Sequence, residues 1–267
     1  MLSLPLDVVK IIFRKLLIQD KLNFRSTCKR YCNLQPILVN GKYHSLLNDS
    51  ILKTLPKLVL LVIDNSRITD KGLSYVQDLA CLSIWKNSVV SNKGLQKLKK
   101  IKLLSISDKK KISDIGLEHL CQLKYLYISG CTKLTTRIIA NNTNLQYLQL
   151  YGKITKNIDD SILKLLVNLK VLILCNERFK LKITNYGLSH LNNLRLLYLV
   201  NYDDCITNET IQKMENIEYV LVLCGFYFLK KPDNIPHNCI WIDDENFDTD
   251  FTNNNLLTIR KKYSFPM

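Results

Sequence analysis

A pair of apolar residues separated by one position recurs eight times in the chain at nearly constant spacing. The successive pairs are 22, 22, 22, 22, 24, 25 and 23 residues apart. A further apolar residue stands three positions before every pair except the first, where Lys57 occupies that position. A period of this length leaves room for only two short elements per unit, so the units must stack to bury a core. The pairs are Leu60/Val62, Leu82/Ile84, Leu104/Ile106, Leu126/Ile128, Leu148/Leu150, Leu172/Leu174, Leu197/Leu199 and Val220/Val222.

A second motif follows the pairs in the same register. The sequence Ile-Thr-Asp-Lys-Gly-Leu at 68–73 returns in related form at 90–95, 112–117 and 183–188, and more loosely at Ile158 and Ile206. Ser or Thr followed by Asp or Asn is typical of a helix N-terminus. Apolar pairs with helical spacing follow, so each unit is predicted to be a strand, a loop and a short helix. These pairs are Leu73/Val76, Leu95/Leu98, Leu117/Leu120, Ile162/Leu165, Leu188/Leu191 and Ile211/Met214.

The complete pattern predicts an α/β leucine-rich-repeat solenoid, a horseshoe of about eight repeats with a period of about 22 residues. Five positions after the first strand residue stand Asn65, Asn87 and Cys131, so residues 55–225 resemble the cysteine-containing leucine-rich repeats. Later repeats have Lys153, Glu177 and Tyr202 at that position. These departures coincide with the longer spacings and predict irregular loops after the fifth to seventh strands.

The residues before the repeats form a separate block with its own helical pattern. Pro5 at a helix start, with Val8, Ile12 and Leu16 spaced by four, describes a short amphipathic helix, and a second begins near Asp20. The block has Leu4-Pro5, Asp7, Ile12, Leu16, Asp20, Leu22 and Cys28-Lys29-Arg30 in the order typical of an F-box, which it therefore resembles, whereas Tyr31 and Thr27 replace the usual Trp and Val. We therefore expect a small all-helical F-box over 1–40, a solenoid with a C-terminal cap over 41–252, and a tail over 253–267.

F-box proteins dock onto the Skp adaptor of cullin-RING ubiquitin ligases and present a second domain to the substrate. The resemblance implies an adaptor-binding surface formed or supported by Leu4, Pro5, Val8, Val9, Ile12, Leu16, Leu22, Cys28 and Tyr31. The alternative is that these residues only cap the first exposed edge of the solenoid.

The strand residues that alternate away from the core line the inside of such a horseshoe. None of the three such positions in each of the eight strands is charged; in the first strand they are Val59, Leu61 and Ile63. Rigid aromatic side chains are enriched at protein interfaces. The face is therefore predicted to bind a polypeptide substrate, unless the tail or neighbouring side chains cover it. The expected substrate-binding residues are Trp85, Tyr125, Tyr127, Tyr147, Tyr151, Tyr198 and Tyr219.

Composition excludes other classes of protein. The formal net charge is +15, but the basic residues are mostly Lys, so nucleic acid is an unlikely partner and a solvated lysine surface is the simpler explanation. The eight Gly fall singly, and Cys28 and Cys32 lack a second ligand pair, so neither cofactor nor metal is expected. No catalytic constellation stands out, and the protein is predicted not to be an enzyme.

Location and origin are indicated only by composition. Charges interrupt the first 18 residues, the nine Cys indicate reduced thiols, and the longest apolar stretch is 11 residues, too short to span a membrane. We expect an intracellular protein, in cytoplasm or nucleus. Abundant Asn, Ile and Lys are typical of AT-rich genomes, such as those of protists or large DNA viruses. The predicted function is substrate recognition in an SCF-type ligase; the alternatives are a scaffold without an adaptor and an RNA-binding solenoid that uses Lys97 to Lys111.

Overall fold

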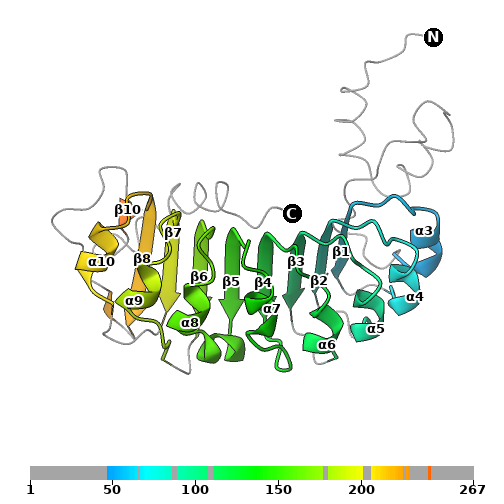
Figure 1. Cartoon of the computed structure of the whole chain (residues 1–267). Coiled ribbons are helices and arrows are strands. Elements are labelled where there is room, and N and C mark those ends of the chain that lie inside the picture. Colours follow the sequence, from blue (N-terminus) through cyan, green and yellow to red (C-terminus); the bar gives the residue numbers. More distant parts are fainter. Residues whose placement is uncertain are drawn as a thin grey trace, which may run out of the picture.

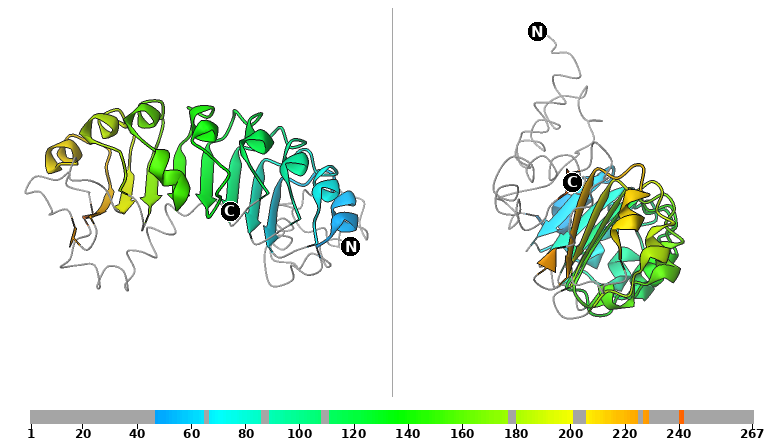
Figure 2. Two further views of the ribbon diagram at one scale, coloured as in Figure 1. Left: turned by 90° about the horizontal axis from the view of Figure 1, so that it is seen from below. Right: turned by 90° about the vertical axis from the view of Figure 1, so that its left-hand side faces the viewer.

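The computed structural model describes residues 47–64, 67–85, 89–107, 111–176, 180–200, 206–224, 227–228 and 240–241. These residues form one array of strands lying side by side, with short helices on one side (Figure 1). Seen from below, the array is an arc with the helices on its convex side and the strands on its concave side (Figure 2). This arrangement confirms the predicted leucine-rich-repeat solenoid.

Each repeat contributes one parallel strand, and the strands follow one another in chain order from β1 to β8. The strands stay short because the apolar alternation lasts only five or six residues in each unit. Leu82, Leu104, Leu126 and Leu148 stand opposite one another, as the repeat spacing predicts. The bounds are β1 (Leu60–Asp64), β2 (Cys81–Trp85), β3 (Leu103–Ser107), β4 (Tyr125–Ser129), β5 (Tyr147–Tyr151), β6 (Val171–Cys175), β7 (Leu196–Val200) and β8 (Tyr219–Cys224).

The helices are mostly single turns, because a repeat of about 22 residues leaves little chain between its two loops. Most begin after a Ser, Thr or Asp, in agreement with the predicted start motif. Helices α3 and α7 and the 3-10 helix η3 were not predicted. The bounds are α3 (Asp49–Lys53), α4 (Asp70–Leu73), α5 (Asn92–Leu95), α6 (Asp114–Leu117), α7 (Arg137–Ala140), η3 (Lys153–Asn157), α8 (Asp160–Leu163), α9 (Asn185–Leu188) and α10 (Asn208–Gln212).

The register predicted for the first repeat is wrong by one residue. Leu61 and Ile63, not Leu60 and Val62, stand opposite Leu82 and Ile84, and both are fully buried. The residue three positions before this pair is then Leu58, also fully buried, so the first repeat does not lack its apolar residue. Every residue from Leu58 to Ile63 is apolar, and alternation alone cannot choose between the two registers.

The corrected register also changes the predicted concave positions of the first strand. The concave positions of β1 are Leu60, Val62 and Asp64 rather than the predicted Val59, Leu61 and Ile63. Asp64 pairs with Trp85 of the neighbouring strand. The expectation that no strand position on this face is charged is therefore wrong at Asp64.

Two strands extend the sheet beyond the repeats. β9 (Tyr227–Phe228) pairs antiparallel with the end of β8, a hairpin that was not predicted. β10 (Ile240–Trp241) pairs parallel with β8, so the predicted closing strand is present. Its register is shifted by one residue, because Trp241 rather than Ile240 stands opposite Val220.

The core is a continuous row of apolar side chains between strands and helices. Five of the six predicted helical pairs are buried in it. In the fifth repeat the buried pair is Leu163/Leu166 rather than Ile162/Leu165, because these two residues stand at the same distances after Ile158 as Leu73 and Val76 stand after Ile68.

The fourth repeat has a polar residue at the position of Val76, Leu98 and Leu120. Asn142 is buried there, and its side chain accepts a hydrogen bond from Leu123 N–H at 2.8 Å. Its Nδ2 donates to the carbonyls of Leu120 and Ile138 at 2.7 and 2.8 Å. The buried amide is thus fully compensated, which its burial requires.

A ladder of polar bonds joins successive helices on the convex side. The first helical residue of one repeat, Asp or Asn, accepts a hydrogen bond from a backbone N–H of the next repeat, at the Ser or Thr of its start motif. The side-chain hydroxyl of that Ser or Thr bonds to the same Asp or Asn. The pairs, with N–H to oxygen distances, are Asp49–Thr69 (2.9 Å), Asp70–Ser91 (2.8 Å), Asn92–Ser113 (2.9 Å), Asp114–Thr135 (2.9 Å), Asp160–Thr184 (2.8 Å) and Asn185–Thr207 (2.8 Å).

Asp and Asn use the hydroxyl in opposite ways. A carboxylate accepts the hydroxyl proton, which leaves the oxygen lone pairs of Ser91 free to accept from Lys93 N–H at 3.3 Å. The Asn92 amide instead donates to Ser113 Oγ, and Ser113 makes no capping bond to its own helix. The same holds for Asn185 and Thr207. In the described repeats this hydroxyl bonds to the N-terminus of its own helix where the ladder residue is Asp, and does not where the ladder residue is Asn.

Glycine in the start motif allows these helices to approach closely. A Cβ added to Gly72, Gly94 or Gly116 would lie 2.1, 2.4 or 2.5 Å from the ladder oxygen of the preceding repeat, and one added to Gly187 would lie 2.3 Å from Asp160 Oδ1. At Gly94 and Gly116 the added atom would also meet the backbone Cα of the ladder residue at 3.0 and 2.9 Å. These four steps therefore require Gly for close packing, whereas Ile138 and Thr210 occupy the same position in the steps from Asp114 and Asn185.

Candidate functional site

The concave face carries its own apolar cluster, separate from the core between strands and helices. Tyr147, Val171, Ile173 and Leu196 are buried in it, and the partly buried side chains around them come from β4 to β8. All seven predicted substrate-binding residues lie on this face, because the period of two places them opposite the core residues. The predicted clustering of the tyrosines is therefore confirmed, whereas their binding role stays a prediction.

Aromatic side chains form a continuous row across β2, β4 and β5. Trp85 stacks on Tyr127 with ring centroids 6.2 Å apart and an interplanar angle of 10°. Tyr127 in turn contacts Tyr151 at 5.8 Å. Trp85 reaches across β3 because that strand has only serine beneath it, and its Nε1 donates to Ser105 Oγ at 3.2 Å. Trp85 remains 37% exposed, so this end of the row is open to a ligand.

A second row lies beside the first, nearer the start of the strands. Tyr125 and Tyr147 meet at 6.4 Å, and Tyr147 is only 5% exposed. The Tyr147 hydroxyl donates to Gln149 Oε1 at 2.6 Å, and Gln149 Nε2 donates to Tyr151 Oη at 2.8 Å. Tyr147 is covered by its neighbours and therefore positions the exposed residues rather than offering a surface of its own.

The row continues through a thiol to β7. Cys175 forms hydrogen bonds with Tyr151 and Tyr198, and burial raises the pKa of its thiol from 9.0 to about 12. Burial also raises the pKa of Tyr151 to about 12, and raises the pKa values of Tyr147 and Tyr198. These groups stay protonated at neutral pH, so the part of the face over β5 to β7 presents hydroxyl groups, rings and aliphatic carbon without charge.

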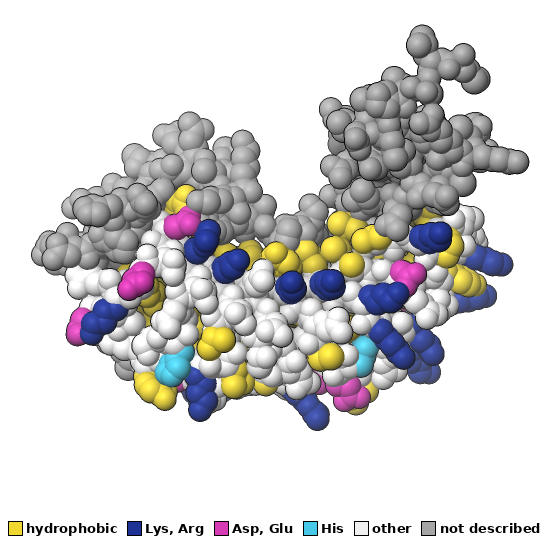
Figure 3. Space-filling view, turned by 45° about the horizontal axis from the view of Figure 1, so that its top comes forward, with side chains coloured by type: hydrophobic (Ala, Val, Ile, Leu, Met, Phe, Trp, Pro, Cys, Tyr) yellow, Lys and Arg dark blue, Asp and Glu magenta, His cyan; other side chains and the backbone are white. Residues whose placement is uncertain are grey.

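A row of basic residues borders this face where the strands begin. The residues directly before β3, β4, β6 and β7 are Lys102, Lys124, Lys170 and Arg195, and all four are exposed. A row of Lys and Arg side chains beside a band of hydrophobic ones is visible in Figure 3. Arg195 lies 3.5 Å from Glu218, but no described carboxylate lies within ion-pair distance of the three lysines. The predicted lysine surface is thus partly organised along the candidate site.

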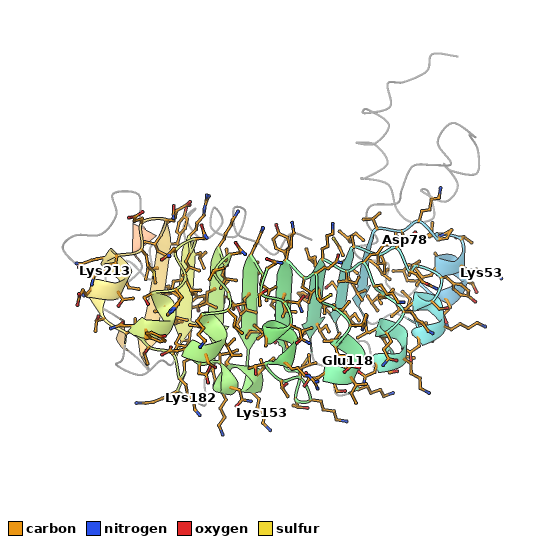
Figure 4. The ribbon with its side chains drawn as sticks, in the orientation of Figure 1. Lys53, Asp78, Glu118, Lys153, Lys182 and Lys213 are labelled. Atoms are coloured by element: carbon orange, nitrogen blue, oxygen red, sulfur yellow. The ribbon has the colours of Figure 1, made fainter. Side chains whose placement is uncertain are left out.

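An open groove of about 500 Å³ lies at the same edge. It is lined by the two lysines that precede β3 and β4 and by side-chain amides between them. Asp78 lies at this end of the strands, whereas Lys153 and Lys182 lie at the opposite end (Figure 4). The lining residues are Lys102, Cys121, Gln122, Lys124, Asn144, Gln146 and Asn168.

The loop position predicted for Asn or Cys can be examined at Cys131, since Asn65 and Asn87 lie outside the described residues. Cys131 is buried, and its thiol donates to the carbonyls of Ile106 and Ser129. The thiol thus satisfies backbone groups of its own and the preceding repeat. At the corresponding positions of later repeats, Lys153 begins η3, whereas Glu177 and Tyr202 lie outside the described part.

No group of His, Cys, Asp and Glu within the described residues could hold a metal ion. None of the described helices is long and apolar enough to cross a membrane. The predicted adaptor-binding residues, from Leu4 to Tyr31, lie outside the described residues, as does the tail over 253–267.

The F-box domain family matches residues 1–35. The chain therefore carries an F-box domain followed by a leucine-rich-repeat solenoid, the second part being defined by the period and the strand register. No curated protein matches the sequence significantly. The boundaries at 40 and 252 stay predictions.

Several solved structures resemble this chain. Internalin C2 of Listeria monocytogenes is 23% identical with a TM-score of 0.45, and the match covers 67% of this chain and 76% of that chain. The protein LIC12759 of Leptospira interrogans is 18% identical with a TM-score of 0.49, and the match covers 68% and 53%. The yeast complex of Rad7 and Elc1 gives a match of 14% identity and a TM-score of 0.40, covering 91% and 94%.

Proposed function

We propose that this chain is the substrate-recognition subunit of an SCF-type cullin-RING ubiquitin ligase. Its F-box binds a Skp-type adaptor, and through it a cullin, while the concave face of the solenoid binds a protein substrate. The observation that carries the proposal is the F-box match at 1–35, directly before a repeat array that is described from residue 47. In this role the chain acts inside the cell and catalyses no reaction itself.

The mechanism is proximity. A stacked array of repeats has nearest-neighbour contacts along its whole length, so it holds its two ends at a fixed separation. A substrate held on the concave face is therefore kept within reach of the ligase bound at the other end, and a high local concentration replaces a chance encounter. The uncharged aromatic face supports a polypeptide ligand, since such side chains are enriched at the centres of protein interfaces.

The test is complex formation with a purified Skp-type adaptor, measured by size-exclusion chromatography. We expect wild type to co-elute with the adaptor in a stoichiometric complex. The double variant Leu4→Ala, Ile12→Asp should elute alone while keeping the circular dichroism of the repeats. The matched control is Tyr127→Ala, which alters only the concave face and should bind the adaptor normally.

A folded wild-type protein that fails to bind the adaptor would overturn the proposal. The protein would then be an interaction scaffold whose N-terminal residues cap the repeats. Thr27 and Tyr31, which replace the usual Val and Trp of the F-box, favour this second candidate.

A further inference from the structure

Over its central strands the concave face is bordered by basic residues at the strand starts and by uncharged residues directly after the strand ends, with Lys153 one position further on. The residues directly before β3, β4, β6 and β7 are basic, and Gln146 occupies the corresponding position before β5. The residues directly after β4, β5 and β6 are Gly130, Gly152 and Asn176, which carry no charge. The basic row therefore coincides with the strands that carry the aromatic cluster.

Two lysines outside this row are neutralised by nearby carboxylates, whereas most of this row, like Lys53, Lys71 and Lys93 on the convex side, has no ion-pair partner within the described residues. Lys100 pairs with Asp78 at 2.6 Å and Lys213 pairs with Glu209 at 2.6 Å. Within the described residues, Lys102, Lys124 and Lys170 have no such partner. The row thus presents a line of positive potential at the border of an apolar surface. A ligand that carries both acidic and apolar side chains would complement the row and the surface.

We propose that the concave face binds an extended acidic segment of a partner protein, with its apolar side chains on the aromatic rows and its Asp or Glu side chains along Lys102, Lys124, Lys170 and Arg195. This inference rests on the proposed function in that it names the class of substrate. Neighbouring strands lie about 4.8 Å apart, so the row from β3 to β7 spans about 19 Å, the length of about six extended residues.

The aromatic geometry favours a polypeptide over single-stranded RNA. Bases bind such proteins by stacking on exposed ring faces, in a groove that tracks the phosphates with positive charge. Here Trp85 and Tyr127 already stack on each other, and Tyr147 is almost completely buried. The strands between the two edges offer no positive charge to phosphates in the described part of the face. RNA is therefore the rival outcome of the test.

The experiment is a selection of random displayed peptides about 12 residues long, twice the length of the row, against the purified full chain. The rim variant Lys102→Glu, Lys124→Glu, Lys170→Glu is selected in parallel. The matched control is Lys53→Glu, Lys71→Glu, Lys93→Glu, which makes the same change in net charge on exposed positions of the convex helices. A fluorescent single-stranded oligouridine is titrated against all three proteins.

We expect wild type and control to enrich peptides in which Asp or Glu alternates with apolar residues. A selected peptide should bind the rim variant about tenfold more weakly or worse, bind the control within about twofold of wild type, and lose affinity when its Glu residues become Gln. Enriched peptides without acidic residues, equal losses in rim and control variants, or selective binding of the oligouridine at the rim would each overturn the proposal.

Adaptor binding separates this inference from the proposed function. The rim variant should still co-elute with the Skp-type adaptor, since its substitutions lie within the repeats. Selection of acidic peptides by a protein that does not bind the adaptor would leave the inference standing and overturn the ligase. A protein that binds the adaptor but selects no acidic peptide would overturn the inference and leave the proposed ligase function standing.

Discussion

The convex and concave sides of the solenoid are built from the same repeats, but only the convex side repeats its chemistry. There the same bond between Asp or Asn and the next Ser or Thr recurs six times, with N–H to oxygen distances of 2.8 to 2.9 Å. On the concave side the equivalent positions of β2 to β6 hold four different residue types: Trp85, Ser107, Ser129, Tyr151 and Cys175. Uniform positions set the scaffold, and variable positions on the same scaffold are those available for recognition.

The strongest test of this contrast is Gly94→Ala. Replacing Gly by Ala in an exposed helix normally stabilises a protein by about 1 kcal/mol. Here we expect destabilisation by about 3 kcal/mol, because the new Cβ would meet Asp70 Oδ1 at 2.4 Å and Asp70 Cα at 3.0 Å. Urea denaturation followed by circular dichroism measures the change. Lys93→Ala, at the neighbouring exposed position, is the control and should change stability by less than about 0.5 kcal/mol.

Substitutions at Asp70 should separate the two bonds of the ladder. Asp70→Ala leaves Ser91 N–H and Oγ without their acceptor and should cost about 2 kcal/mol. Asp70→Asn keeps an acceptor for the N–H but makes the hydroxyl an acceptor, as at Asn92, so only the cap of α5 is lost, at about 1 kcal/mol. Equal losses of stability in the two variants would show that the hydroxyl direction does not matter.

Burial of Cys175 on the concave face should make the free energy of unfolding depend on pH. The folded state holds the Cys175 proton until about pH 12, whereas the unfolded thiol loses it near pH 9. Above pH 9 the unfolded state binds fewer protons, so stability falls as pH rises toward 12, by on the order of 1 kcal/mol per pH unit. Cys175→Ala should flatten this slope, whereas Cys121→Ala, which removes an exposed thiol, should leave it unchanged. Urea midpoints between pH 8 and 10.5 decide the matter; identical slopes would contradict the burial of this thiol.

The smallest expected effect is that of Ser105→Ala. It removes the hydrogen bond from Trp85 Nε1 and should cost about 1 kcal/mol or less. Trp85 gains freedom on an open edge of the face, so its fluorescence should shift to longer wavelength. Ser107→Ala in the same strand is the control, and a shift of equal size in both variants would count against an ordered Trp85.

The sequence predicts the repeats well because each core position recurs in many units. It also predicts the placement of Tyr125, Tyr127 and Tyr147, since a strand period of two assigns their face once the register is known. The predicted register is wrong at β1, where consecutive apolar residues hide the alternation and pairing with β2 decides, and at β10, where Trp241 rather than Ile240 stands opposite Val220.

The ladder of bonds between helices could not be predicted, because a role within a single repeat already explained the residues that form it. Ser or Thr before Asp or Asn already accounts for a helix start, and nothing in one repeat shows that the Asp bonds to the next. The Gly two positions after the Asp carried the missing signal, since a helix has no use for it unless a neighbour comes close. Asn142 was missed for a related reason: a polar residue at an apolar position is visible, but its three partners come from two repeats.

The ladder has one missing rung. Thr136 stands where the pattern requires Asp, and it makes no corresponding bond to Asp159 in the described part of the chain, so the polar chain divides into one block ending at Thr135 and another beginning at Asp160. Repeat proteins unfold as coupled neighbours, and a weakened step between two repeats divides them into separate cooperative units. Pulled from its ends, the solenoid should therefore yield in two steps, with the break between α7 and α8. A ligand lying along β4 to β7 would span that joint and stiffen it, so that recognition and mechanical resistance would rise together.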